Sequence, residues 1–110
     1  MNPRHYYDET FKMNYYLCIG WKQKDIDRYL RKTFNYECNN KLKDGRTLFC
    51  TNDKGSIILV WTRNKKPSDI AHECVHAANF ALDAIGHKYD YENDEVMAYL
   101  VGKLVVECMK

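Results

Sequence analysis

A run of six residues, Ala71-His72-Glu73-Cys74-Val75-His76, contains the side chains that could bind and use a metal ion. His72 and His76 are four positions apart, so on a helix both imidazoles project from one face, about one turn apart. Two imidazoles placed in this way can ligate one Zn²⁺ ion at roughly 2.0 to 2.1 Å. Glu73 lies about 100° further round the helix, close enough to reach a water on the metal without being a ligand. The alternative is that the two histidines share a helix face without a common role.

A third ligand is predicted further along the chain. Eighteen residues separate His76 from Glu95, which is room for the rest of one helix, a reversal and the first turn of an antiparallel helix. Ala98 and Gly102 follow Glu95 at helical spacing, and small residues there would let the two helices approach closely. Glu95 is therefore the predicted third ligand, unless it is simply an acidic residue that favours a helix N-terminus. Two neighbouring carboxylates are the alternative ligands: Glu92 and Asp94.

The motif lies in a segment, residues 68–85, that is apolar nearly all round, which predicts a buried central helix. Pro67 and Asp69 suit the first turn of this helix, and Gly86 marks its end. A final helix is expected from an N-cap at Asn93 to about Met109.

The helices and strands before the motif are predicted from changes in the spacing of apolar residues along the chain. Residues 14–21 and 46–51 read as strands, and 46–51 forms a hairpin with 56–62 around an Asn-Asp-Lys-Gly turn. Residues 57–61 have no polar alternation, so both faces of that strand should be covered. Residues 22–34 read as an amphipathic surface helix, 35–43 as a connection, and 1–12 as an arm or irregular lead-in. The expected fold is α+β, with a small, mainly antiparallel sheet packed on the motif helix and the C-terminal helix, in one domain over residues 1–110.

Composition narrows the range of functions. The chain has 17 Lys and Arg against 15 Asp and Glu, a net charge of +2, which gives no case for nucleic-acid binding. No apolar run approaches the roughly 20 residues that span a bilayer, and the N-terminus does not read as a signal peptide. Five cysteines without a C-x-x-C spacing indicate reduced thiols in a cytoplasmic protein, the alternative being a disulfide between Cys38 and Cys50.

With His72, Glu73, His76 and Glu95, the chain resembles the gluzincin branch of the zincin metallopeptidases, in which H-E-x-x-H is followed by Glu at the same spacing. It also resembles small phage-encoded metallopeptidases in which a His-Glu-x-x-His-Ala-Ala helix precedes an Asn-Asp-Glu helix; the resemblance covers about residues 56–106. It implies a minimal zincin-like domain that binds one Zn²⁺ per chain through His72, His76 and Glu95 and uses Glu73 as general base toward a metal-activated water. It further implies that the strand 56–62 is an edge strand, which pairs with an extended peptide substrate.

The expected function is a zinc-dependent hydrolase, first of all a peptidase acting on a peptide or protein in the cytoplasm, which is the host cytoplasm if the chain is phage-encoded. The donor that stabilises the oxyanion should come from a local loop, from the N-terminal half or from a partner protein that completes the cleft. Five residues are candidates for this donor or for orienting a metal ligand: Asn79, His87, Tyr89, Tyr91 and Tyr99. Two other functions stay open: a noncatalytic protein that uses the zincin scaffold to bind a host or partner protein, and a metal-dependent amidase. The presence of Glu73 favours an enzyme, because structural zinc binding does not require this carboxylate.

Overall fold

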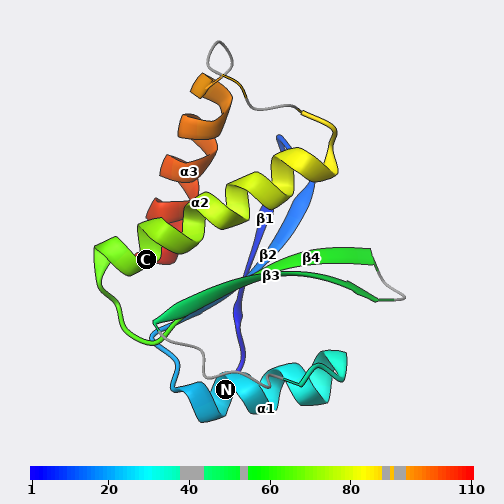
Figure 1. Cartoon of the computed structure of the whole chain (residues 1–110), viewed down its shortest axis with the longest axis vertical. Helices are drawn as coiled ribbons and strands as arrows, with labels where there is room; N and C mark the ends of the chain where they lie inside the picture. The colour runs from blue at the N-terminus through cyan, green and yellow to red at the C-terminus, as the bar shows by residue number, and fades with distance from the viewer. Residues whose placement is uncertain (38–43, 53–54, 88–89, 91–93) are drawn as a thin grey trace.

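Four strands form one mixed sheet in the computed structural model, which describes residues 1–37, 44–52, 55–87, 90 and 94–110 (Figure 1). The elements, in chain order, are β1 (Arg4–Asp8), β2 (Met13–Ile19), α1 (Gln23–Phe34), β3 (Gly45–Asn52), β4 (Gly55–Thr62), α2 (Pro67–Ala84) and α3 (Asp94–Cys108). The strand order is β1-β2-β4-β3. The outer pairs β1/β2 and β3/β4 are antiparallel, whereas the central pair β2/β4 is parallel. The α+β class is confirmed, and the expected mainly antiparallel sheet is a mixed one.

Alternate residues of β4 face opposite layers of the domain. Ile58 and Val60 pack into the cluster that also contains the buried residues of α2 and α3. Leu59 and Trp61 pack into a second cluster with Ile26 and Leu30 of α1. In Figure 1, α1 covers one face of the sheet, and α2 and α3 cover the other. The prediction that both faces of this strand are covered is therefore confirmed.

The N-terminal arm expected over residues 1–12 is wrong, because Arg4–Asp8 forms the edge strand β1. Tyr6 stacks on Tyr15 of β2 with ring centroids 5.8 Å apart. Asp8 is buried and its Oδ1 accepts a 2.9 Å hydrogen bond from the backbone N–H of Thr10. These contacts dock the start of the chain onto the sheet, and Tyr6 also packs against the cluster formed with α2 and α3.

The strand 56–62 was expected to be the edge strand, and this prediction is also wrong. β4 lies between β2 and β3, and the edges of the sheet are β1 and β3. The physical reason is visible in the sequence of β4, because a strand that is apolar on both faces loses most free energy when it is exposed to water. On the α2 side of the sheet, the free edge is therefore β3.

The helix that carries the motif, α2, buries one face and not its whole surface. Ile70, Cys74 and Ala77 are buried, whereas Val75 and Phe80 are 42% and 38% exposed. In the same way, α3 buries Met97, Leu100, Leu104 and Cys108. The small residues Ala98 and Gly102 are exposed, and a Cβ added at Gly102 would touch nothing within 4 Å, so they do not form the expected contact with α2. None of the helices in the described part of the chain is long and apolar enough to cross a membrane.

Candidate metal centre

The two motif histidines converge on the exposed side of α2. Nε2 of His72 lies 3.3 Å from Nε2 of His76, and the ring centroids are 4.9 Å apart. Both side chains are exposed. Two nitrogens that bind one tetrahedral Zn²⁺ at roughly 2.0 to 2.1 Å are about 3.3 to 3.4 Å apart. The same distance allows a hydrogen bond between one protonated and one unprotonated nitrogen. His72 and His76, hereafter the histidine pair, therefore fit two positions of a zinc site without rearrangement.

Glu73 points away from solvent, toward the edge strand β3. It is only 6% exposed. Oγ1 of Thr47 on β3 donates to Oε1 of Glu73 at 2.8 Å and lies 3.0 Å from the carbonyl oxygen of Glu73. Residue 45 of β3 is a glycine, and a Cβ there would come within 2.9 Å of Cγ and 3.1 Å of Oε2 of Glu73. The absence of a side chain at Gly45 lets the carboxylate lie against the strand, and Thr47 fixes its orientation.

Thr47 and Gly45 were missed by the sequence analysis, which predicted their strand but gave it no role in the site. A signal was available, since Gly45, Thr47 and Phe49 alternate along β3 and so share one face of the strand. Ring centroids of Phe49 and Phe80 of α2 are 6.1 Å apart, which shows that this face contacts α2. What the sequence did not show was which strand lies beside the motif helix.

Glu95 lies in the first turn of α3 and is exposed. Among the residues that the structure describes, no three His, Cys, Asp or Glu side chains are grouped so that they could hold a metal ion. The structure thus brings the histidine pair together and does not place Glu95 beside it, so Glu95 stays a prediction. The alternative ligand Asp94 is exposed in the same turn, and Glu92 lies outside the described residues.

The candidates for the oxyanion donor are scattered. Asn79 is exposed on α2, and His87, just after α2, is half-buried with no hydrogen-bond partner for Nε2 among the described residues. Tyr99 is 58% exposed, and its ring centroid lies 5.9 Å from Nζ of Lys103. Lys103 also faces Asp8 of β1, at 3.8 Å, which places Tyr99 on the β1 side of α3. Tyr89 and Tyr91 lie outside the described residues. No oxyanion donor is therefore assigned.

The described cysteines, Cys18, Cys50, Cys74 and Cys108, are free thiols, as expected from their spacing. Cys38, the other half of the alternative disulfide, lies outside the described residues.

Comparison of the chain with models of protein families, with curated proteins and with solved structures finds no match.

Proposed function

We propose that this chain is a zinc-dependent hydrolase, first of all a peptidase, with His72, His76 and Glu95 as ligands and Glu73 as general base. The observation that carries the proposal is the 3.3 Å separation of the two exposed Nε2 atoms, with a buried carboxylate on the next residue of the same helix. Two imidazoles and a carboxylate are a donor set that suits zinc.

Zinc at the histidine pair would supply a Lewis acid that lowers the pKa of water toward about 7. The protein itself would contribute a base placed beside that water. Glu73 would accept the proton of the attacking water and deliver it to the leaving amine. Its hydrogen bond from Thr47 leaves the second carboxylate oxygen to do this, and holds the group in one orientation.

The position of β3 supports a peptide as substrate. β3 is an edge of the sheet, and Thr47 of this strand contacts Glu73 directly. An edge strand offers unpaired backbone N–H and C=O groups to which an extended peptide can add as a further strand. A peptide bound along β3 would run beside the carboxylate. The resemblance implied that the strand 56–62 pairs with the substrate; we propose β3 for this role instead.

Glu95 is proposed as the third ligand although it does not lie beside the histidine pair in this structure. A third protein ligand is what catalytic zinc sites normally require, with a fourth position left for water or substrate. Glu95 is exposed and so is free of buried contacts that would hold its side chain elsewhere. Coordination would then require the first turn of α3 to approach α2.

Metal content tests the proposal directly. The chain is purified without added metal, and zinc is measured by mass spectrometry in the wild type and in His76→Ala, Glu95→Ala and Glu73→Gln. His5→Ala is the matched control, because His5 lies on β1 and contacts Asn14 of β2. About one zinc per chain is expected in the wild type, His5→Ala and Glu73→Gln, and loss of zinc is expected in His76→Ala and Glu95→Ala.

The other outcomes are equally informative. Zinc that survives Glu95→Ala but not His76→Ala would keep the metal site and remove Glu95 from it. No stoichiometric zinc in the wild type, even after zinc is offered, would overturn the proposal. With zinc bound, cleavage of a peptide library is compared between the wild type and Glu73→Gln. A zinc-loaded wild type that cleaves no peptide or amide would favour the noncatalytic, partner-binding alternative.

A further inference from the structure

Two thiols meet in the layer between α2 and α3. Sγ of Cys74 lies 3.8 Å from Sγ of Cys108, although the two residues are 34 positions apart in the chain. Both are buried, at 0% and 4% exposure. Cys74 follows Glu73 on α2, and Cys108 is the last residue of α3. A weak S–H···S hydrogen bond thus connects the helix of the histidine pair with α3.

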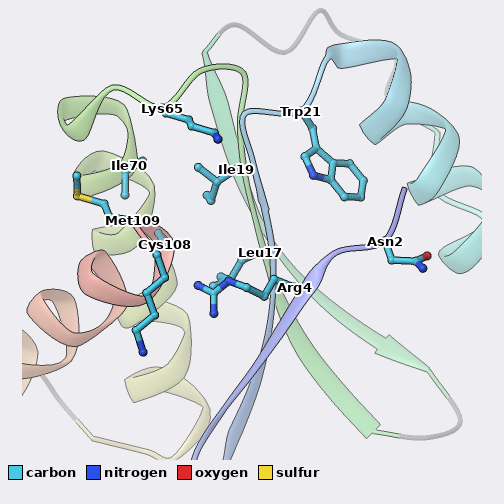
Figure 2. A pocket seen from close by; sticks show the side chains of 10 residues that line it. Asn2, Arg4, Leu17, Ile19, Trp21, Lys65, Ile70, Cys108 and Met109 are labelled. Carbon is cyan, nitrogen blue, oxygen red and sulfur yellow. The ribbon is translucent and has the colours of Figure 1, made fainter.

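A pocket of about 450 Å³ is lined by one of these two cysteines and not by the other. It is lined by Cys108, by apolar residues that include Leu17, Ile19 and Ile70, and by three cationic side chains. Figure 2 shows Arg4 of β1 and Lys65, which precedes α2, extending into this space, with Cys108 on the α3 side. Cys74 is not among the lining residues. A small molecule in the pocket would therefore reach Cys108 first.

The charge of the pocket is positive. The three cations are Arg4, Lys65 and Lys110. Glu107 accepts hydrogen bonds from Arg4 at 3.3 Å and from Lys110 at 2.8 Å, so one carboxylate offsets part of this charge. Within the described residues, Lys65 has no ion pair, and its aliphatic carbons lie over Gly20. A ligand for this pocket would be an anion with an apolar portion.

We propose that Cys108 and Cys74 form a redox-active pair that reacts, through this pocket, with low-molecular-weight anionic disulfides. In the first step the thiolate of Cys108 attacks one sulfur of the disulfide RSSR. A mixed disulfide of Cys108 with RS forms, and the second RS leaves as a thiolate that takes a proton from solvent. In the second step Sγ of Cys74 attacks Sγ of Cys108 and expels the remaining RS as a thiolate, which takes up the proton that Cys74 gives up. The net change is two protein thiols and RSSR to one protein disulfide and two RSH.

The choice of Cys108 as the first nucleophile agrees with its surroundings. A thiolate, and not a thiol, is the attacking species. The hydrogen bond with Cys74, and then the positive charge of Arg4, lower the pKa of the Cys108 thiol. Burial raises the pKa of Cys108 as well, but less than the hydrogen bond lowers it, whereas at Cys18 and Cys50 burial acts without such a hydrogen bond and raises the pKa. Among the thiols that the structure describes, Cys108 alone combines a lowered pKa with a pocket wall.

Closing the disulfide requires a small movement. The two sulfur atoms must approach from 3.8 Å to about 2.05 Å. Cys108 ends α3, so a shift of one terminal turn can supply most of this approach. The proposal does not depend on zinc at the histidine pair.

The test exposes the fully reduced, metal-free protein to three disulfides at low ionic strength, where charge effects are largest. Glutathione disulfide is anionic, 2-hydroxyethyl disulfide is neutral, and cystamine is cationic. Products are followed by intact mass and located by peptide mapping. We expect the Cys74–Cys108 disulfide in the wild type and a stable mixed disulfide on Cys108 in Cys74→Ser. If Cys74→Ser does not fold, the Cys74–Cys108 disulfide in the peptide map of the wild type still tests the thiol pair, and trapping the wild-type mixed disulfide at early times locates the first nucleophile.

The charge of the pocket is tested by a matched pair of variants. Lys65→Gln removes a cation that lines the pocket. Lys66→Gln removes the neighbouring cation, which is exposed and does not line the pocket. Glutathione disulfide should react at least several-fold faster than cystamine, and Lys65→Gln alone should reduce this ratio. Equal rates for the three disulfides, or equal effects of the two variants, would overturn the assignment of the pocket. Modification of Cys50 while Cys74 and Cys108 stay reduced would overturn the thiol pair.

Discussion

Replacing Thr47 by Val removes the hydrogen bond that the hydroxyl of Thr47 donates to the buried carboxylate of Glu73. Val keeps the branched shape and strand preference of Thr, so the change is confined to the hydroxyl. A lost hydrogen bond to a charged group costs about 1.5 to 3 kcal/mol. For a domain of 110 residues, each kcal/mol lowers Tm by roughly 4 °C, so the melting temperature should fall by about 6 to 12 °C.

The measurement is thermal or urea denaturation of metal-free protein, because bound metal would add its own stabilisation. Thr47→Ser is the control, since it keeps the hydroxyl and loses only a methyl group, worth about 0.8 kcal/mol. In a Glu73→Gln background the same hydrogen bond is neutral, and Thr47→Val should then cost only about 0.5 to 1.5 kcal/mol. If Thr47→Val proves as stable as Thr47→Ser, the carboxylate is not anchored by Thr47 and this account of its orientation fails.

Three further predictions concern the surroundings of the site. Gly45→Ala places a Cβ 2.8 Å from the backbone oxygen of Trp61, which cannot move cheaply, so we expect a loss of about 1 to 3 kcal/mol in a denaturation experiment. Gly102→Ala meets open space in the middle of α3 and should instead stabilise the protein by up to about 1 kcal/mol. A hydrogen bond from Lys110 lowers the pKa of Glu107, so this carboxylate stabilises the fold above its unfolded-state pKa of 4.5 and stops doing so as the pH falls through the lower folded-state value. Denaturation should give a higher free energy of unfolding for the wild type than for Glu107→Gln at neutral pH, and this difference should disappear near pH 3.

The elements set by local rules were predictable from the sequence. The change from alternating to helical period located α1 within one residue at its start, and Pro67 begins α2 at its first position as expected. The positive φ of Gly86 explains the end of the motif helix. The histidine pair belongs to the same class, because two residues four apart on a helix must share a face.

The sequence did not show how the helices and strands are arranged relative to one another. β1 was missed because only one side of this edge strand is buried, and its exposed residues give the segment the composition of a loop. The third ligand depends on the direction in which α3 leaves the connection after α2. In the structure α3 packs through Leu100 and Leu104, which leaves Glu95 on an exposed side. Spacing along the chain limits how far a carboxylate can travel but not which face of the next helix it occupies.

The rotation of α2 about its own axis connects the fold to the candidate site. One flank of the helix is held against β3 at two points, by Thr47 on Glu73 and by Phe49 on Phe80. These points lie seven residues apart on α2, close to two helical turns, so together they fix which side of the helix faces the strand. With that flank fixed, the next side round the helix must carry the histidine pair outward, beside the free edge of β3. The hydrogen bond to the buried carboxylate of Glu73 and the buried apolar face of α2 therefore both hold the helix in the rotation that directs the two imidazoles outward.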